Sequence, residues 1–555
     1  MAPLIAEGTT ASAQAIANLR VGMRYGTTAV PSANLQNRIG YGGGFEFGYF
    51  SAERVFVPIG AKTSEGSISI LTDRNSVWHP AATTNDFGEY REGASGVVVV
   101  GAFHIQLNES FESFDQAGVA ANAYEDAFVK FDSGQFFVSV GNYTSRNDAN
   151  SALSSRGFGD IASVNSGTQH TVVITQTGTN NILFEFDYGG THQLGVMPLP
   201  IGGETPETWF RGNRYHGGFE IVRNVGEFTV LQYLDIEDYT KGVVPYEMGN
   251  TWPIEALKAQ AVCARSYAFA HLNRHRDSGF DICTTVHCQV YRGRASANER
   301  SDQAVDETAN VYMMYNGRVV QAYYAASNGG ASENVENVWL EAVPYLRGVL
   351  DPYEADVADR IRDYEWVRTY TPQQIADRLR SRGHSVTGTI VSMRVSEHSP
   401  TGNVVSVTMR DSGGRELTFR RREQLISALG VVTQRFIIGN AVLGVGGIYV
   451  NSPAQAVEQG SQSYMINGDG EVTLLPGGTV YAITDSDSIV PVTGEGGGAS
   501  GGSDTGLVNG VFTITGWGNG HNVGMSQWGA YSMAMYHNKN YVDILTFYFT
   551  GVTIG

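Results

Sequence analysis

The N-terminal part of the chain alternates short polar and apolar runs, a pattern typical of β-strands whose side chains point to opposite faces of a sheet. The runs LRVGMRYG, FEFGYF, RVFVPIG and SISILTD lie between residues 18 and 78, and glycines separate them. The longest apolar runs, such as GVVVVGAF at 96–103, are as long as a strand. None approaches the roughly 20 residues of a membrane-spanning helix, so we expect no membrane span.

The pattern changes between residues 97 and 177. It predicts the order strand, helix, two strands, helix and strand, over 97–107, 113–126, 127–143, 145–155 and 170–177, with a hairpin turn at Asp132-Ser133-Gly134. This order is a split βαβ unit. The segments FHIQL and FFVSVGNYTSRNDANSAL within it resemble the SPOR repeat family, small domains that bind peptidoglycan. An unrelated ferredoxin-like α+β domain is the alternative.

Helical periodicity next appears after residue 250. A pair of strands is expected to lead to Asp235–Asp238 and to be followed by a short turn. A helix is then predicted from about Asn250 or Thr251 to His271, with Pro253 in its first turn. Residues 305–350 predict further strands and a loop. A helix capped by Thr371 and Pro372 is predicted within 363–383, and strands within 388–420.

These elements predict an α+β fold, a β-rich chain of several domains. We expect a β-rich region at 1–95, the split βαβ domain at 96–165, and a core of mixed strands and a few helices at 166–555. A Gly/Ser-rich insertion at about 440–510, with GEGGGASGGSD at 494–504, has the composition of a flexible linker.

Composition narrows the function. Hydrophobic residues make up 42% and charged residues 17%, which excludes a chain disordered throughout. The 37 basic and 55 acidic residues give a net charge of −18. That balance argues against nucleic acid, whose binding depends on Lys and Arg contacts to phosphate. It favours a neutral or basic polymer over an anionic one.

Three long motifs together resemble the stage II sporulation protein D and LytB amidase-enhancer family. They are DYTKGVVPYEMGNTWPIEALKAQAVCARSYA at 238–268, YYAASNGG…VENVWLEAVPYLRGVLDP at 323–352, and GNGHNVGMSQWGAYSMA at 518–534. Membership implies a carbon–oxygen lyase: a lytic transglycosylase that cleaves the MurNAc–GlcNAc bond of peptide-stripped peptidoglycan glycan strands and leaves 1,6-anhydroMurNAc ends. The alternative is a non-catalytic wall-binding protein that activates a separate N-acetylmuramoyl-L-alanine amidase.

The resemblance also implies a location outside the cell or in its wall. The first residues, MAPLIAEGTTASAQ, have neither the basic nor the apolar segment of a signal peptide. We therefore expect any signal or anchor to lie outside this sequence.

Glu247 in the segment PYEM aligns with the family's essential glutamate. Glycoside cleavage needs a proton on the leaving oxygen, and apolar neighbours suit a carboxyl group that must keep its proton. A lytic transglycosylase needs only one such group, because the sugar's own 6-hydroxyl is the nucleophile. Composition alone would favour a helix-capping role for Glu247.

Eight further residues are predicted to bind substrate. A spacing of seven puts Lys258 and Arg265 on one helical face, and the resemblance places Arg265 among the substrate-site residues. A surface salt bridge is the alternative. Tyrosine rings can stack on sugars, and Ser, Asn, Gln and His side chains can form hydrogen bonds with them. The alternative is that these residues only support the fold, as a core strand that ends in a turn. The residues are Lys258, Arg265, Tyr324, Ser327, Asn328, His521, Ser526 and Gln527.

Three cysteines are few. Cys263 lies in an apolar helical stretch and is expected in the core. Cys283, His287 and Cys288, with His275 or His271 upstream, suit a tetrahedral zinc ion that holds a loop, as in some relatives. A Cys283–Cys288 disulfide and free thiols are the alternatives. We expect no organic cofactor.

Overall fold

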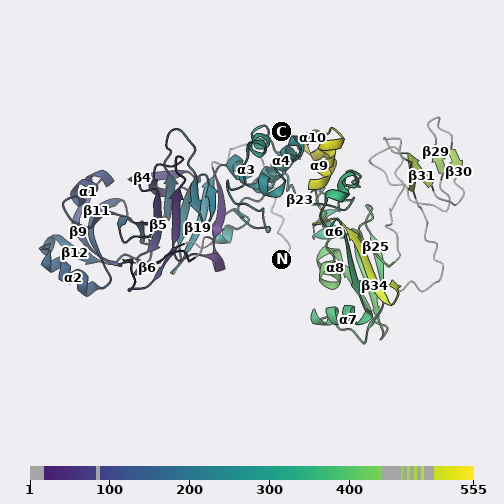
Figure 1. Ribbon diagram of the computed structural model, residues 1–555, viewed down its shortest axis with the longest axis horizontal. Coiled ribbons are helices and arrows are strands. Elements are labelled where there is room, and N and C mark those ends of the chain that lie inside the picture. The colour runs from purple at the N-terminus through teal and green to yellow at the C-terminus, as the bar shows by residue number, and fades with distance from the viewer. Residues whose placement is uncertain are drawn as a thin grey trace. The chain divides into compact units, whose positions relative to one another are not determined.

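The computed structural model describes residues 18–82, 88–224, 226–339, 341–439 and 506–555, together with four short strands between 464 and 492. The chain divides into two compact units, and each is described by itself. The N-terminal unit runs to Gln321 and the C-terminal unit runs from Ala322 to Thr553. Helices and strands mix in several sheets, which confirms the predicted α+β class (Figure 1).

Two large sheets form most of the N-terminal unit. The first has the order β20-β1-β19-β18-β15-β3-β4 and the second β12-β9-β11-β10-β14-β13-β5-β2-β16-β17. One apolar core joins the two sheets, and within it the rings of Phe47 and Phe184 stack at 5.3 Å. The strands of the first sheet are β20 (Ile282–Cys283), β1 (Leu19–Arg24), β19 (Phe228–Leu234), β18 (Gly218–Arg223), β15 (Leu194–Pro198), β3 (Phe45–Phe50) and β4 (Phe56–Thr63).

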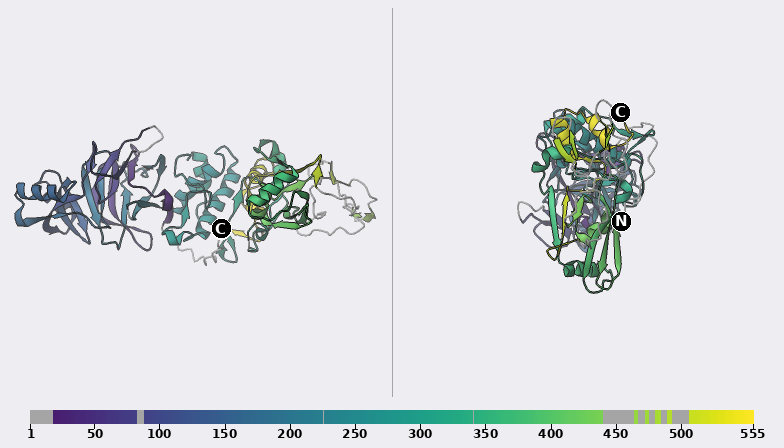
Figure 2. Two further views of the ribbon diagram at one scale, coloured as in Figure 1. Left: turned by 90° about the horizontal axis from the view of Figure 1, so that it is seen from below. Right: turned by 90° about the vertical axis from the view of Figure 1, so that its right-hand side faces the viewer.

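The predicted split βαβ unit is confirmed as an element order within the second sheet. The helices α1 (Phe114–Ala121) and α2 (Arg146–Ser155) lie beside its strands in both views (Figures 1 and 2). The hairpin turn at Ser133-Gly134 joins β10 to β11 as predicted. The strands of the sheet are β12 (Ala162–Asn165), β9 (Phe103–Phe111), β11 (Gln135–Tyr143), β10 (Ala127–Asp132), β14 (Ile182–Asp187), β13 (Val172–Gln176), β5 (Ser67–Thr72), β2 (Ala33–Asn37), β16 (Thr208–Phe210) and β17 (Asn213–Tyr215).

The split βαβ strands are continuous with the rest of this sheet, so they share one compact unit with the residues around them. A small sheet of β7 (Glu89–Glu92), β6 (Ser76–His79) and β8 (Val99–Val100) shares an apolar cluster with them. The resemblance to SPOR domains and the boundaries at 95/96 and 165/166 stay predictions.

A helical layer follows the first sheet. It holds α3 (Ile236–Glu247), α4 (Ile254–Ala270) and α5 (Glu299–Asp306). The short turn predicted after Asp238 is wrong, because α3 extends to Glu247. Asp235 caps this helix by accepting a hydrogen bond from the Glu237 backbone N–H at 2.7 Å. The predicted start of α4, at Asn250 or Thr251, is three or four residues early, because the residue before a proline disfavours helical backbone. Pro253 is the N-cap residue, with a ψ of 138°, and does not lie in the first turn as predicted.

The C-terminal unit contains two small sheets with helices against them. Their orders are β24-β34-β28, with β33 beside β34, and β25-β26-β27. The predicted cap of α7 is confirmed, since Thr371 accepts from the Gln374 backbone N–H. The elements are β24 (Glu365–Tyr370), α7 (Pro372–Ser381), β25 (Ile390–His398), β26 (Val404–Asp411), β27 (Glu416–Arg420), α8 (Arg421–Leu429), β28 (Phe436–Ile438), β33 (Leu507–Val508) and β34 (Val511–Trp517).

Short elements bring two distant motifs of this unit together. The strand β23 (Tyr324–Ala325) pairs in parallel with β35 (Met525–Ser526), about 200 residues later in the chain. Helices α9 (Gln527–Tyr536) and α10 (Tyr541–Tyr548) contact β35, the 3-10 helix η4 (Tyr353–Arg360) packs against α9, and α6 (Val335–Val338) packs against α8. The strands predicted at 305–350 are confirmed only as β23 and the short β21 (Met313–Tyr315) and β22 (Arg318–Val319) of the N-terminal unit.

Most of the predicted Gly/Ser-rich insertion, including 494–504, lies outside the described residues. The short strands within it are β29 (Tyr464–Ile466), β30 (Val472–Leu474), β31 (Val480–Ile483) and β32 (Ile489–Val492). Across the described part of the chain, no helix combines the length and the apolar character needed to cross a bilayer.

Candidate functional site

Glu247 is the last residue of α3 and is half-buried. The backbone N–H of Val290 lies 3.4 Å from its Oε1 atom and donates to it. The next residue, Met248, is 2% exposed, and its backbone N–H caps α3 by donating to the Val244 carbonyl. The carboxyl group is therefore held at a defined place, at the junction of α3, the turn before α4 and the segment that follows Cys288.

Arg265 of α4 is fully buried, at 0% exposure. Its Nε donates to Glu237 Oε1 at 2.8 Å, and its Nη2 forms a second, shorter bond to Glu237 Oε2. Two further bonds reach the carbonyls of Val311 and Val305. The guanidinium thus joins α4 to the first turn of α3, the helix that ends in Glu247.

Lys258 forms ion pairs with Glu255, at 2.9 Å, and Glu307, at 2.6 Å. Both Lys258 and Arg265 reach the segment around 305–311, so the predicted shared helical face is confirmed. Binding of substrate by either residue stays a prediction.

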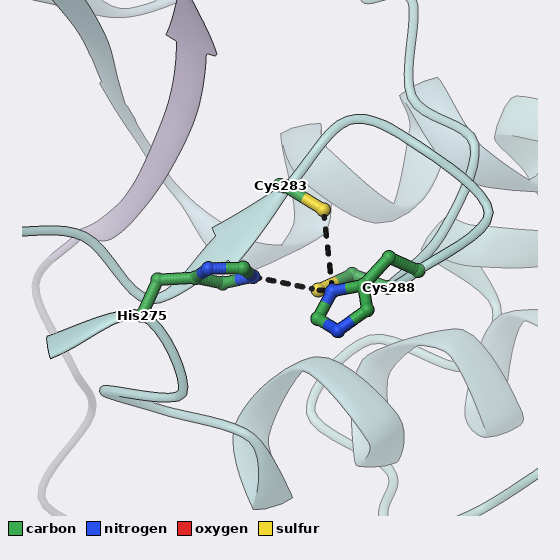
Figure 3. A group of neighbouring side chains, drawn as sticks. His275, Cys283 and Cys288 are labelled. Atoms are coloured by element: carbon green, nitrogen blue, oxygen red, sulfur yellow. Dashed lines mark hydrogen bonds between the residues drawn. The ribbon is translucent and has the colours of Figure 1, made fainter. Parts of the chain in front are cut away.

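Four potential metal ligands meet beside these helices. The ligand atoms of His275, Cys283, His287 and Cys288 all lie within 4.8 Å of one another. Figure 3 shows the side chains of His275, Cys283 and Cys288 directed toward one another. His275 Nε2 lies 3.4 Å from the Cys288 sulfur, and His287 Nδ1 lies 3.8 and 3.7 Å from the two sulfurs.

These distances fit a tetrahedral zinc ion. Zn–S bonds of about 2.3 Å and Zn–N bonds of about 2.05 Å place sulfur and nitrogen ligands about 3.6 Å apart. The thiols are free, so the predicted alternative of a Cys283–Cys288 disulfide is not formed here. The hydrogen bond from Cys288 lowers the pKa of the Cys283 thiol, which favours a thiolate. Among the two upstream histidines it is His275 that joins the group.

His271 is instead a core residue. It is 4% exposed, and its Nδ1 atom lies 2.8 Å from the Tyr267 carbonyl. Cys263 is fully buried in α4, as predicted.

A second group, within the C-terminal unit, surrounds the buried carboxylate of Glu354 on η4. Ser327 Oγ donates to Oε2 at 2.7 Å, the Asn328 backbone N–H donates to Oε1 at 2.7 Å, and the Ser526 hydroxyl donates a short bond to Oε1. Burial and, to a smaller extent, the charge of the neighbouring Asp351 raise the pKa of Glu354 to about 7.

Asp351 extends this group and is also fully buried. Its Oδ2 accepts from Asn328 Nδ2 at 2.8 Å and from the Tyr548 hydroxyl at 2.6 Å. The three predicted sugar ligands Ser327, Asn328 and Ser526 are each at most 1% exposed and turn their polar atoms to these acids. Their contact with substrate stays a prediction, and their visible role is to hold two motifs together.

His521 contacts the aromatic residues of the same unit. Its ring lies 5.3 Å from that of Trp339 and 6.2 Å from that of Tyr323, and its Nδ1 accepts from the Val523 backbone N–H at 3.1 Å. Burial and, to a smaller extent, the positive charge of Arg422 lower the pKa of His521 to about 4, so the imidazole is neutral at neutral pH.

The other predicted ligands here differ in exposure. Tyr324 is half-buried on β23, and Gln527 is 6% exposed at the start of α9. The neighbouring Asn522 adopts the left-handed conformation, with φ of 62°, and donates to the Asn328 carbonyl at 2.7 Å. That conformation explains why a small or amide residue suits this loop.

Sequence reasoning missed Glu354, Asp351 and Glu237. Each is a carboxylate that accepts hydrogen bonds from residues at least 23 positions away. Acidic side chains between apolar neighbours, as in GVLDPYEADV, are the signal that would have indicated Asp351 and Glu354.

Comparison with known proteins gives the following matches. Residues 224–315, which include Glu247 and all four potential metal ligands, match the family model SpoIID, stage II sporulation protein. An uncharacterised protein of Brachyspira hyodysenteriae is 27% identical over 65% of this chain and 78% of its own length. The amidase enhancer of Bacillus subtilis is 28% identical over 57% of this chain and 40% of its own length.

The stage II sporulation protein D of Bacillus subtilis is 27% identical over 29% of this chain and 50% of its own length. The chain therefore spans half or less of the two Bacillus proteins.

Proposed function

We propose, from the premise that this chain belongs to the stage II sporulation protein D family, that it acts on the bacterial cell wall as a peptidoglycan lytic transglycosylase. The proposed substrate is a glycan strand without stem peptides, and the bond cleaved is MurNAc–GlcNAc. The observation that supports this most is the position of Glu247: within the matched segment, half-buried, at the end of a helix, and held by the Val290 N–H.

The proposed reaction needs one carboxyl group in two roles. Glu247 donates its proton to the oxygen that leaves with GlcNAc while the bond from that oxygen to C1 of MurNAc breaks. The resulting carboxylate takes the proton of the 6-hydroxyl of the same MurNAc, and O6 bonds to C1. The product is a 1,6-anhydro ring, no water is consumed, and Glu247 regains its proton.

The surroundings of Glu247 suit this role. The C-terminal end of a helix carries partial negative charge, which disfavours a second negative charge there and suits a carboxyl group that donates a proton. Arg265 fixes the first turn of the same helix through Glu237. In this proposal Arg265 orients the acid, and its contact with substrate is not required.

We also propose a structural zinc site. His275, Cys283, His287 and Cys288 would hold the ion, which would link the two ends of the loop that carries them. Four protein ligands form a closed structural site, whereas catalytic zinc keeps one position open. The arrangement therefore gives little support to a metal-dependent amidase centred on these residues.

A second candidate function is activation of a separate amidase without catalysis. The similarity to the Bacillus subtilis protein named amidase enhancer, over 324 residues, favours it. Both candidate functions place the chain at the cell wall, outside the cell. The second function also requires a partner, an amidase that acts on the wall.

Product analysis decides between them. The purified chain is incubated with glycan strands carrying or lacking stem peptides, and the products are analysed by mass spectrometry. We expect anhydro ends from stripped strands, and their loss in Glu247→Gln. The matched control is Glu299→Gln, an exposed acid on α5. Full activity of Glu247→Gln would refute the mechanism, and products formed only when an amidase is added would favour the second candidate.

A further inference from the structure

A small pocket in the N-terminal unit gathers positive charge. It has a volume of about 170 Å³ and nine lining residues, of which three are arginines and none is acidic. The chain as a whole has more acidic than basic residues, 55 against 37. The three arginines, Arg24, Arg211 and Arg292, come from three distant segments of sequence.

Two of these arginines have no carboxylate partner within the described residues. Arg211 pairs with Glu89 at 3.2 Å, whereas no ion pair is formed by Arg24 or Arg292. The Arg292 guanidinium instead lies over the ring of Tyr246, 5.6 Å from its centre. Burial, and then the like charge of Arg211, lowers the pKa of Arg24. Arg24 is half-buried and Arg292 is exposed. A bound anion would offset the unfavourable interaction between Arg24 and Arg211.

Neutral groups complete the lining. Met23, Phe210 and Tyr291 are at most 6% exposed and form an apolar surface. Burial raises the pKa of Tyr215 to about 12, so its hydroxyl keeps its proton and can donate. Arg211 has a φ of 48° in the turn between β16 and β17, a left-handed position that normally takes Gly, Asn or Asp.

The pocket lies close to Glu247 along the chain. Val290 donates to Glu247, and Tyr291 and Arg292, the next two residues, line the pocket. Two residues span about 7 Å at most. Tyr246, which precedes Glu247, contacts Arg292.

We propose that this pocket binds the carboxylate of a ligand, with Arg24 and Arg292 as its main partners. Resting on the proposed function, we assign that carboxylate to the lactyl group of a muramic acid residue whose stem peptide has been removed. Removal of the peptide turns a neutral amide into a charged carboxylate, which arginine binds strongly. The volume of about 170 Å³ is below the ~300 Å³ of typical ligand sites, so the pocket suits a small charged group such as a carboxylate.

Binding is measured in the Glu247→Gln background, which stops turnover. The three probes are a GlcNAc–MurNAc tetrasaccharide with free lactyl carboxylates, the same sugar with stem peptides, and a GlcNAc tetrasaccharide. We expect the first to bind best. Arg24→Gln and Arg292→Gln should each weaken it roughly tenfold and leave the GlcNAc tetrasaccharide within about twofold. Salt should weaken the first probe and leave the uncharged GlcNAc tetrasaccharide unchanged.

Arg362→Gln, an exposed arginine of the C-terminal unit, is the matched control and should change nothing. The melting temperature of Arg24→Gln should not fall, because a repulsive charge is removed. Equal binding of the three probes, or variants that weaken all of them alike, would overturn the assignment. Charge-dependent binding in this background, together with no anhydro products from the unmodified chain, would refute the transglycosylase but keep the pocket.

Discussion

The backbone N–H of Val290 donates to Glu247 Oε1 at 3.4 Å, two residues after Cys288. Between them, Gln289 Oε1 accepts from the Tyr239 hydroxyl of α3 at 3.1 Å. The segment that leaves the potential metal site therefore contacts α3 at two places. Whatever fixes that segment also fixes the position of the proposed acid.

Replacement of Cys288 by serine should release the proposed zinc ion and loosen this segment. We expect one zinc per chain in the unmodified protein and much less in Cys288→Ser, by atomic emission. Loss of a ligand that binds only the folded state lowers stability, so the melting temperature should fall by roughly 5 °C or more. Formation of anhydro ends should fall with it, because Val290 moves.

Cys263→Ala is the control for this experiment. Cys263 is fully buried in α4 and lies outside the four-residue group. The variant should keep its zinc, whatever its stability. Equal zinc content in Cys288→Ser and the unmodified chain would contradict the site.

Arg265→Met should destabilise the N-terminal unit, since it leaves Glu237 without its bidentate partner. Breaking such a pair costs about 3 kcal/mol of unfolding free energy. Addition of Glu237→Gln should cost less than the sum of the two single changes, and chemical denaturation measures both. Activity should fall through kcat, because α3 shifts.

Lys258→Met provides the comparison for Arg265. Its ion pairs are partly exposed, and such pairs contribute about 1 kcal/mol or less. If Arg265→Met instead keeps full stability and raises only KM, then Arg265 contacts substrate directly, as the sequence predicts.

Gly524→Ala should destabilise the C-terminal unit. Gly524 has a φ of 73°, and a Cβ atom there would lie 2.1 Å from the Tyr323 carbonyl oxygen. We expect a loss of more than about 1 kcal/mol in thermal or chemical unfolding. Gly510→Ala separates the two causes, because Gly510 has a similar φ of 79° and open space around it. Equal losses in the two variants would mean that the close approach to Tyr323 has no cost.

Local signals explain what the sequence predicted well. The Thr371 cap, the Ser133-Gly134 turn and the clustering of the four potential metal ligands all depend on residues within 13 positions of one another. The helix α3 was missed because Gly242 and Pro245 disfavour helix. Packing overrides this preference: a Cβ atom on Gly242 would lie 2.4 Å from the Tyr291 ring, so only glycine fits there.

The second group could not be predicted from local patterns. Ser526 reaches Glu354 across 172 positions, and Tyr548 reaches Asp351 across 197. Ser327, Asn328 and Ser526 are polar residues in glycine-rich motifs, which suggests a sugar groove. In the fold they satisfy the hydrogen bonds of two buried acids, because a buried carboxylate without partners is costly.

Glu354 should make the stability of the C-terminal unit fall as pH rises from about 4.5 to about 7. Burial and Asp351 raise its pKa from 4.5 to about 7 in the folded chain. Between these values the unfolded chain loses the proton and the folded chain keeps it, so the folded state binds more protons and its stability decreases with pH. The stabilisation is complete below pH 4.5 and lost above 7, and amounts to about 3 kcal/mol.

Glu354→Gln tests this pH dependence, since an amide resembles the protonated acid in charge and does not titrate. Calorimetric unfolding from pH 4.5 to 7.5 should show a smaller decrease in the variant than in the unmodified chain. Asp351, whose pKa burial also raises, contributes a slope of the same sign in both chains. Glu416→Gln, an exposed acid on β27, should leave the slope unchanged. If unmodified chain and Glu354→Gln decrease in parallel, Glu354 is ionised in the fold throughout this range, and its hydrogen bonds outweigh its burial.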